Sequence, residues 1–330
     1  MAEGAGAARM DSLRRNLWTF GPLVAALFLE LAVFEMIGRS QDNPGFTSFN
    51  TMMMVLNQSA IFGVMAVGMT FVIITGGIDL SVGSLMAFGG VLSATVVRHG
   101  QSPAWVWILA GWCAALAVGM CAGSATGLLV TRLRIPPFIA TLALMSSLRG
   151  LGNLLTDGKP ISPLPPEYTW LGRGQLFGKL PVSVVLFMLV LAAGFVLLNH
   201  TRFGRYTRAI GGNEESARLS GVPVMRVKWL VYTLCGALAV LAGLMLTSRL
   251  GSGDPKIGLG DELSVIAAVV VGGTSLSGGR GSIAGTFVGL LVVSVLNSGL
   301  NWIGIETFGQ QVTLGLVILA AVLLDRVKGD

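Results

Sequence analysis

The sequence predicts an all-α polytopic membrane protein with about ten transmembrane helices. The 330-residue chain is 53% hydrophobic and only 12% charged, whereas a soluble domain carries about 25% charged residues. Charge-poor windows close to 20 residues long, the length that a helix needs to cross a bilayer, recur along the chain. The strict alternation of apolar and polar residues that marks a membrane β-barrel is absent from the sequence.

Ten apolar stretches account for the predicted spans. The first follows basic residues, as in a signal peptide, but it is too long and lacks a cleavage site, so we expect an uncleaved helix. The stretches at 80–97 and 263–276 are short and interrupted by glycine, which predicts broken or re-entrant helices. The others are predicted as continuous spans: 17–38, 52–75, 105–130, 136–155, 180–198, 229–248, 283–300 and 308–325. Within one of them, Gly119, Gly123 and Gly127 recur every fourth residue, which predicts a face for close helix packing.

Lys and Arg concentrate on one side of this predicted topology. Most of the 22 Lys and Arg residues lie in the N-terminal segment and in 131–135, 199–228, 274–282 and 325–330. The positive-inside rule places these segments in the cytoplasm. We therefore expect a cytoplasmic tail at 1–16, a single transmembrane domain at 17–325 with a cytoplasmic loop at 199–228, and a cytoplasmic tail at 326–330. An even number of spans puts both termini in the cytoplasm.

Motifs that the sequence lacks argue against several classes of function. No G-x-x-x-x-G-K-[ST] phosphate loop occurs, so we expect the chain neither to hydrolyse ATP by that route nor to bind a cofactor. The 3 Cys lie within predicted helices and the 2 His near span ends, which predicts no metal site. A hydrolase using Ser81 or Ser277 is a weak hypothesis, because no His or Lys base is near either serine in sequence. An ion-coupled secondary transporter or a channel is the alternative to a transporter with a partner ATPase, and its intramembrane carboxylates would be Glu30, Glu35 and Asp79.

The stretch VIITGGIDLSVGSLMAF (72–88) interrupts an apolar region with polar residues. Gly76 and Gly77 can leave helical geometry at no steric cost. Asp79, assisted by Ser81, then stands where the N-cap of a new helix belongs, with backbone N–H groups of residues 80–82 as donors. Asp79 is either mainly this cap or part of a polar pathway lined by the break, and the two roles are compatible.

A related pattern, VVVGGTSLSGGRGSIAGTFVG, returns at 269–289. GGIDLS and GGTSLS share a glycine pair and Leu-Ser, and two comparable breaks indicate a site between two halves of the chain. Intramembrane amides either join this site or form hydrogen bonds between helices. We assign the following residues to a translocation pathway at the breaks: Gly76, Gly77, Asp79, Ser81, Gly272, Gly273, Ser275, Ser277, Asn57 and Asn297.

The segment NHTRFGRYTRAIGGNEESARLSGVPVMRVKW (199–229) is the longest polar stretch on the basic side. Its centre, NEESARLSG, has the signals of a short helix. These signals are an N-cap, acids in the first turn, a base in the last turn and two terminating residues: Asn213, Glu214, Glu215, Arg218, Gly221 and Pro223. A rigid element of this kind is suited to docking a soluble partner, and a plain surface turn is the alternative.

Three segments together carry a resemblance to a family. GMTFVIITGGIDLSVGSLMAF, RFGRYTRAIGGNEESARLSGVPV and ELSVIAAVVVGGTSLSGGRGS closely resemble the permease subunits of bacterial ABC sugar importers of the ribose, xylose and arabinose type. The resemblance extends from about residue 17 to residue 325 and implies a type II importer-like bundle in the inner membrane. It also implies a second permease copy, a periplasmic sugar-binding protein and a cytoplasmic ATPase that uses ATP. The transported solute would be a monosaccharide, such as ribose or a related pentose or hexose.

The same resemblance implies how this chain meets its ATPase. The segment from Ala209 to Pro223 resembles the coupling helix that docks in the ATPase subunit. The residues that we assign to this coupling are Gly211, Gly212, Asn213, Glu214, Glu215, Ala217, Arg218 and Gly221.

Overall fold

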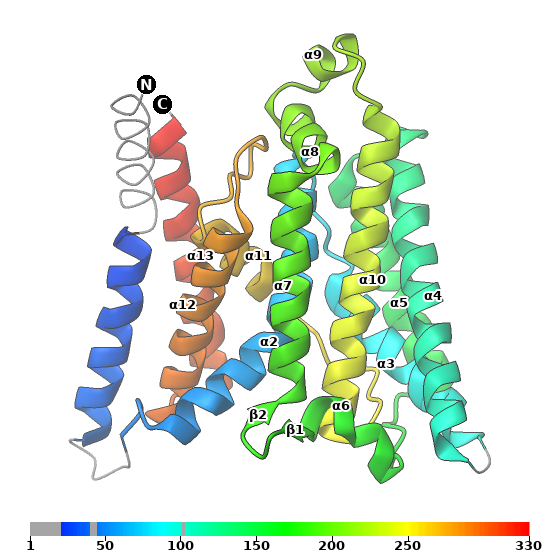
Figure 1. Cartoon of the computed structure of the whole chain (residues 1–330), viewed down its shortest axis with the longest axis vertical. Helices are drawn as coiled ribbons and strands as arrows, with labels where there is room; N and C mark the ends of the chain where they lie inside the picture. The colour runs from blue at the N-terminus through cyan, green and yellow to red at the C-terminus, as the bar shows by residue number, and fades with distance from the viewer. Residues whose placement is uncertain (1–20, 40–44, 101–102, 330) are drawn as a thin grey trace.

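The computed structural model describes residues 21–39, 45–100 and 103–329, which form a bundle of helices (Figure 1). The predicted N-terminal tail, 1–16, and the start of the first predicted span lie outside these residues. In the described part, seven helices are long and apolar enough to cross a membrane: Gly21–Arg39, α2 (Phe49–Ile74), α4 (Ala104–Thr131), α5 (Pro137–Thr156), α7 (Val182–His200), α10 (Val224–Leu250) and α12 (Ile283–Trp302). Three further apolar helices are α3 (Val82–Arg98), α11 (Asp261–Val271) and α13 (Thr307–Gly329).

Short elements cover the two ends of the bundle (Figure 1). One end carries α8 (Arg202–Gly212) and α9 (Glu214–Leu219). The other carries a 3₁₀-helix (Pro166–Thr169), α6 (Trp170–Arg173), β1 (Gln175–Leu176) and β2 (Leu180–Pro181). The two strands pair antiparallel, with Leu176 opposite Leu180. This small hairpin is the one departure from the predicted all-α class within the described residues.

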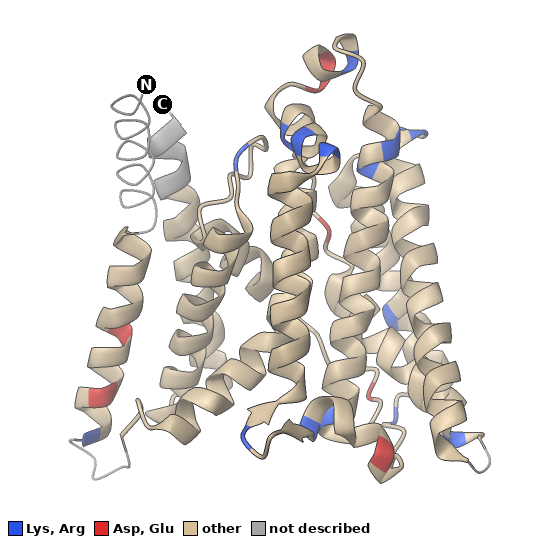
Figure 2. Ribbon diagram, viewed as in Figure 1, with Lys and Arg blue, Asp and Glu red and all other residues tan. Residues whose placement is uncertain are grey.

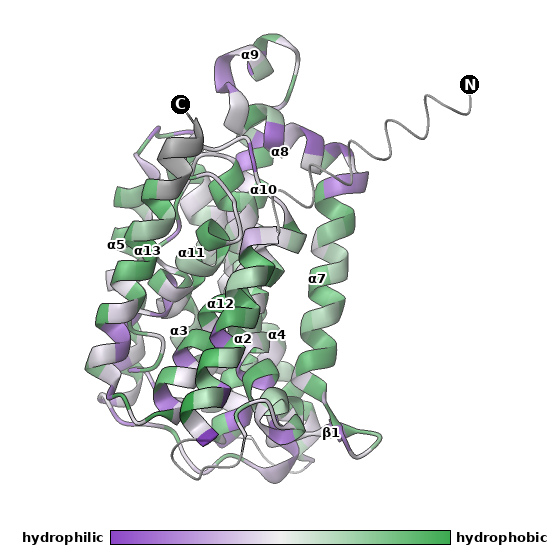
Figure 3. Cartoon of the chain, turned by 90° about the vertical axis from the view of Figure 1, so that its left-hand side faces the viewer, coloured by the Kyte–Doolittle hydropathy of each residue, from purple (hydrophilic) through white to green (hydrophobic). Residues whose placement is uncertain are grey.

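Polar side chains are concentrated at the same two ends of the bundle, and apolar side chains lie between them. Apolar residues extend along the long helices, and polar residues are concentrated at α8, α9 and the opposite loops (Figure 3). Figure 2 shows Lys and Arg around α8, α9 and the adjacent helix ends, and further Lys and Arg at the opposite end of the bundle. An apolar middle between two polar ends is the pattern of a protein that crosses a bilayer.

Helices α2 and α10 form the centre of the bundle. In the most apolar stretch of α2, 83% of the residues are buried. Helix α10 packs against α2, α3 and α4. A Cβ at Gly123 would collide with the Tyr232 carbonyl oxygen, and one at Gly119 would lie 2.8 Å from the Gly236 carbonyl oxygen. The predicted glycine face of α4 is therefore confirmed as a close contact with α10, since only glycine allows backbones to approach so near.

The break predicted at 75–81 is confirmed. Helix α2 ends at Ile74 near α8, residues 75–81 lead back into the bundle, and α3 then begins at Val82. A second break, which the sequence analysis did not predict, joins α10 to α11. There, residues 251–260 lead back into the bundle from the end that carries the hairpin.

Several helix ends differ from the predicted bounds, and α10 begins at Val224, within the predicted loop at 199–228. The span at 263–276 is shorter, because α11 begins at Asp261 and ends at Val271, where Gly272 and Gly273 (φ +86°) leave helical geometry. The last helix is longer than predicted, because α13 continues to Gly329 through most of the predicted tail at 326–330.

Candidate functional site

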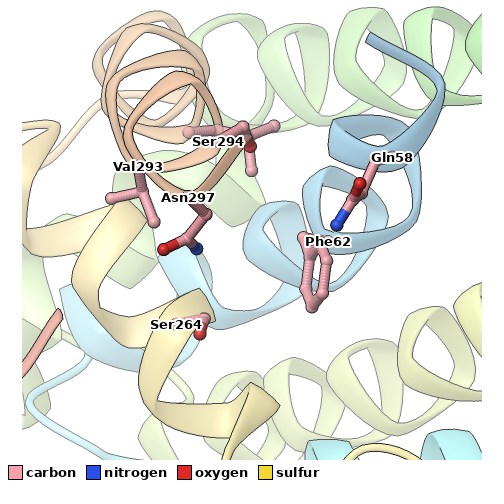
Figure 4. Close-up of a pocket in the computed structure, with 7 residues that line it drawn as sticks. Gln58, Phe62, Ser264, Val293, Ser294 and Asn297 are labelled. Atoms are coloured by element: carbon pink, nitrogen blue, oxygen red, sulfur yellow. The ribbon is translucent and has the colours of Figure 1, made fainter. Parts of the chain in front are cut away.

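A polar cavity lies between α2, α11 and α12 (Figure 4). It has a volume of only about 20 Å³ and is lined by Gln58, Phe62, Ser264, Leu290, Val293, Ser294 and Asn297. Figure 4 shows Gln58 and Phe62 coming from α2, Ser264 from α11, and Ser294 and Asn297 from α12. The lining has two amides, two hydroxyls and one aromatic ring, and in this conformation it leaves room for about one water molecule.

A second, larger cavity of about 340 Å³ adjoins the first, and Gln58 and Asn297 line both. Its other polar residues are Thr51, Ser298, Asn301 and Gln310. Asn297 precedes the end of α12 at Trp302 by about a turn and a half, so both cavities lie in the half of the bundle nearer the hairpin. Together they form a polar zone that extends from the middle of the bundle toward that end.

The predicted pathway residues do not all meet at this zone. Asn297 lines both cavities. Asn57 lines neither, because its side-chain oxygen accepts a hydrogen bond of 2.6 Å from the Ser183 hydroxyl, between α2 and α7. Asn57 therefore has the interhelical role that was its alternative. Among the lining residues, Phe62, Ser264 and Ser294 had no distinguishing signal in the sequence.

Asp79 lies in the first break, where it is fully buried. Its Oδ1 atom accepts from the backbone N–H of Ser81 at 2.9 Å and from the Ser81 hydroxyl at 2.6 Å. The helix begins at Val82, so the N-cap position belongs to Ser81 rather than to Asp79. The capping prediction was thus wrong in position, and Asp79 stabilises the turn that precedes α3.

The predicted residues of the second pattern lie elsewhere. Gly272, Gly273, Ser275 and Ser277 belong to a loop at the α8 end, where the Ser275 N–H donates to the Arg280 carbonyl oxygen at 3.0 Å. As at GGIDLS, one helix ends directly before GGTSLS and another begins after it, because α11 ends at Val271 and α12 begins at Ile283.

This loop, the end of α2 and the end of α8 meet in one contact, which we call the glycine junction (Gly76, Gly211, Gly278 and Gly279). The Gly279 N–H donates to the Ile74 carbonyl oxygen at 2.9 Å. A Cβ on Gly211 would collide with that carbonyl oxygen and with the Gly279 nitrogen. A Cβ on Gly278, whose φ is +85°, would lie 3.1 Å from the Gly76 nitrogen. All three sequence segments that carry the family resemblance contribute residues to this junction.

The segment after the junction is the predicted short helix. Helix α9 spans Glu214–Leu219, and the Asn213 side chain caps it by accepting from the Ser216 N–H at 2.8 Å. Gly221 ends it with φ +81°. These features confirm the helix and its start and stop signals. Ala217, in the middle of the helix, is buried.

Ion pairs link α9 to the start of α10. The Glu214 carboxylate pairs with Lys228 at 2.9 Å and with Arg218 at 3.3 Å, and Glu215 pairs with Arg218 at 3.3 Å. These groups are mostly solvent-exposed, so each pair contributes little to stability. Leu219 is 81% exposed at the tip of the segment. The predicted coupling residues therefore form a compact projection with an apolar tip and a charged base.

Helix α8 connects this projection to the bundle. The Arg208 guanidinium donates to the Leu198 carbonyl oxygen at 3.0 Å and to the Asn199 side-chain oxygen at 2.7 Å. Partial burial lowers the pKa of Arg208, and the two acceptors offset the cost of that burial. Arg208 thus fixes α8 to the end of α7.

Comparison with known proteins supports a transport role for this arrangement. Residues 51–324 match the family model described as branched-chain amino acid transport system, permease component. This match covers α2 through most of α13 and so includes the cavities, the glycine junction and α9. No solved structure matches the chain.

Three similar proteins have names that state a substrate. The chain is 49% identical over 310 residues to the ribose import permease protein RbsC of Bacillus subtilis, with 93% of this chain and 92% of the relative covered. It is 44% identical over 290 residues to RbsC of Escherichia coli K12, with 87% and 88% covered. It is 38% identical over 328 residues to the L-arabinose transport system permease protein AraH of Escherichia coli K12, with 98% and 96% covered.

The glycine junction predicts different outcomes for two adjacent substitutions. Gly211→Ala places a methyl group against the Ile74 carbonyl oxygen, whereas Gly212→Ala has no heavy atom within 4 Å of the new Cβ. We expect Gly211→Ala to lower stability by about 1–3 kcal/mol through overpacking and to speed proteolysis within 199–228. Gly212→Ala should behave as the wild type in thermal unfolding and limited proteolysis of the purified chain. Equal behaviour of the two variants would contradict the junction.

Proposed function

The chain belongs to the family of branched-chain amino acid transport system permease components and is the permease subunit of an ABC sugar importer, and on this basis we propose that its sugar is ribose. It is a multi-pass protein of the inner membrane, it is a transport subunit rather than an enzyme, and it works with an ATPase and a substrate-binding protein. The family assignment argues against a secondary transporter or channel without an ATPase.

The choice of ribose rests on the sequence identity between this chain and its relatives. Relatives named for ribose import are 40–49% identical to this chain over most of its length, and the relative named for L-arabinose is 38% identical. The amides, hydroxyls and aromatic ring that line the two cavities do not distinguish one monosaccharide from another. The substrate-binding protein would add the further selectivity.

The topology of the importer follows from combining the long and short helices. The seven long helices together with α3, α11 and α13 give ten crossings in a type II importer-like bundle. The Lys and Arg residues around α8 and α9 favour a cytoplasmic position for that end (Figure 2). With ten crossings, both termini are cytoplasmic, 17–325 is one transmembrane domain, and the hairpin end faces the periplasm.

In this orientation the polar cavity lies in the outer half of the membrane, where the binding protein releases the sugar. Gln58, Ser264, Ser294 and Asn297 offer hydrogen bonds that replace those of water. The sugar binds weakly here and leaves again, as conduction requires. A second copy of the chain completes the passage in this proposal, as in the importers that the sequence resembles.

Helix α9 is the element that the ATPase holds and moves. Its apolar tip, Leu219, enters the ATPase, and the Asn213 cap and the buried Ala217 keep it a compact helix. A rigid element transmits a movement that a flexible turn would absorb. The glycine junction then passes the movement of α8 to the end of α2 and to the loop before α12.

Uptake measurements test the choice of sugar. Cells that lack their own ribose uptake should accumulate radiolabelled ribose when they express this chain with its ATPase and its sugar-binding protein. Excess unlabelled ribose should abolish this uptake, excess L-arabinose should leave most of it, and a protonophore should not stop it at constant ATP. Stronger competition by arabinose than by ribose would contradict the assignment.

Asn297→Leu tests the cavity. The substitution removes an amide that lines both cavities, and we expect a loss of ribose uptake on the order of tenfold, the effect of about 1.4 kcal/mol. Abundance in the membrane should stay normal. The control is Gln311→Leu on α13, an exposed amide that lines neither cavity. Normal uptake with Asn297→Leu, or equal losses in both variants, would place the passage elsewhere.

Leu219→Asp tests the coupling helix. An aspartate at this exposed tip preserves the buried Ala217 and the ion pairs, but it opposes insertion into an apolar socket. We expect the ATPase to be lost from the purified complex and ribose uptake to fall to background. The control, Leu133→Asp, changes a leucine that is 66% exposed near the end of α4, and it should retain the ATPase. Wild-type amounts of ATPase on the Leu219→Asp variant would contradict the assignment.

A further inference from the structure

The two breaks in the bundle lead into helices that begin with related sequences. Gly77–Val82 reads G-I-D-L-S-V and leads into α3, which begins at Val82, whereas Gly260–Val265 reads G-D-E-L-S-V and forms the first turn of α11, which begins at Asp261. In each, a glycine and one variable residue precede an acid, Leu-Ser and a buried valine. Asp79 in the first thus corresponds to Glu262 in the second.

The two helices run in opposite directions. Helix α2, which precedes the first break, ends at the glycine junction, where the Ile74 carbonyl oxygen accepts from Gly279. Helix α10, which precedes the second break, ends near the hairpin, where the Ser248 hydroxyl accepts from the N–H of Gly172 in α6. Each break turns the chain back into the bundle from its own end. The pairs α2–α3 and α10–α11 are therefore related as an inverted repeat.

The beginnings of the two half-helices touch. A Cβ on Gly83, in the first turn of α3, would collide with the Gly258 carbonyl oxygen and lie 2.5 Å from Oε2 of Glu262. A Cβ on Gly258 would in turn lie 2.5 Å from the Gly83 carbonyl oxygen. The Glu262 carboxylate thus lies against the start of α3, where a helix carries partial positive charge.

Both corresponding acids are buried. Asp79 is 0% exposed and Glu262 is 8% exposed. Glu262 Oε2 makes no hydrogen bond to any described residue, whereas the Asp79 carboxylate interacts with the Cys235 thiol of α10 as well as with Ser81. Buried carboxylates are costly in a membrane protein, so their presence at corresponding positions of the two motifs, just before α3 and in the first turn of α11, indicates a requirement beyond filling space.

Arg149 of α5 secures the second break. Its Nη1 atom donates to the Pro255 carbonyl oxygen at 2.8 Å and to the Ile257 carbonyl oxygen at 2.5 Å. The guanidinium also lies close enough to Asp261 and Glu262 for electrostatic attraction. Arg149 therefore holds residues 255–257 and balances the acids at the start of α11.

We infer that Asp79 and Glu262 are equivalent positioning residues, which hold two inverted half-helices start to start and thereby place the cavity-lining side chain of Ser264. Ser264 is two residues after Glu262 and lines the polar cavity, so a shift in the start of α11 changes the cavity wall. The link to sugar passage rests on the proposed function of the cavity, whereas the positioning of α11 does not.

Thiol labelling measures the positioning without relying on transport. The parent for labelling lacks the two exposed cysteines, through Cys113→Ala and Cys121→Ala. In this background, Ser264→Cys reports on α11, and Ser294→Cys, in the same cavity, reports on α12. We expect the isosteric Glu262→Gln to change the labelling rate of Ser264→Cys by about tenfold, as when a buried charged contact is lost, and to leave Ser294→Cys unchanged.

Three controls make the outcome decisive. Glu262→Asp keeps the charge and should restore much of the parent rate. Asp79→Asn should change the same rate, and its effect should not add to that of Glu262→Gln, because the two helix starts share one contact. An unchanged Ser264→Cys rate, or equal changes at both reporters, would overturn the inference. A changed rate with normal ribose uptake would preserve the positioning role and reject the cavity as the sugar path.

Discussion

The structure depends on one constraint, which is that irregular backbone inside a membrane must be enclosed by protein. Residues 75–81 and 251–260 both leave helical geometry within the bundle, and lipid offers no hydrogen-bond partners for their backbone groups. The bundle supplies those partners through Arg149 at Pro255 and Ile257 and through Asp79 at Ser81. The central helices α2 and α10 are the ones that lead into the two breaks. Their burial is a consequence of having to surround this non-helical backbone.

Glycine makes the required close contacts possible at two levels of the bundle. In the middle, Gly83 and Gly258 allow the starts of α3 and α11 to meet, and at the α8 end the glycine junction joins three segments that are far apart in sequence. Both contacts place backbone against backbone, so neither can be replaced by adjustable side chains. A movement at such a contact displaces whole helices, because there is no flexible layer to absorb it.

The long helices and α9 could be predicted because their signals are local. Apolar length defines the spans, and Asn213, Gly221 and Pro223 define α9 by cap and stop signals. The second break was missed because GSGDPKIGLGDE looks like an exposed loop, so Asp261 and Glu262 were assigned outside the membrane. GGTSLS was chosen as the counterpart of GGIDLS on composition. The contact of Gly279 with Ile74 joins residues about 200 positions apart, and composition alone does not reveal such a pairing. Ser264 and Phe62 line the cavity through packing alone, which no local signal reveals.

The cavity and the glycine junction share two helices, which gives the proposed ATPase contact at α9 a structural route to the cavity. Helix α2 carries Gln58 and Phe62 at the cavity and ends at Ile74 in the junction. Helix α11 carries Ser264 at the cavity and ends just before the loop that contains Gly278. Because each helix is rigid between its two contacts, a shift of α8 at the junction must change the relative positions of the cavity walls formed by α2 and α11. Coupling then needs no chain of side-chain rearrangements, only two helices that are each fixed to the junction at one end.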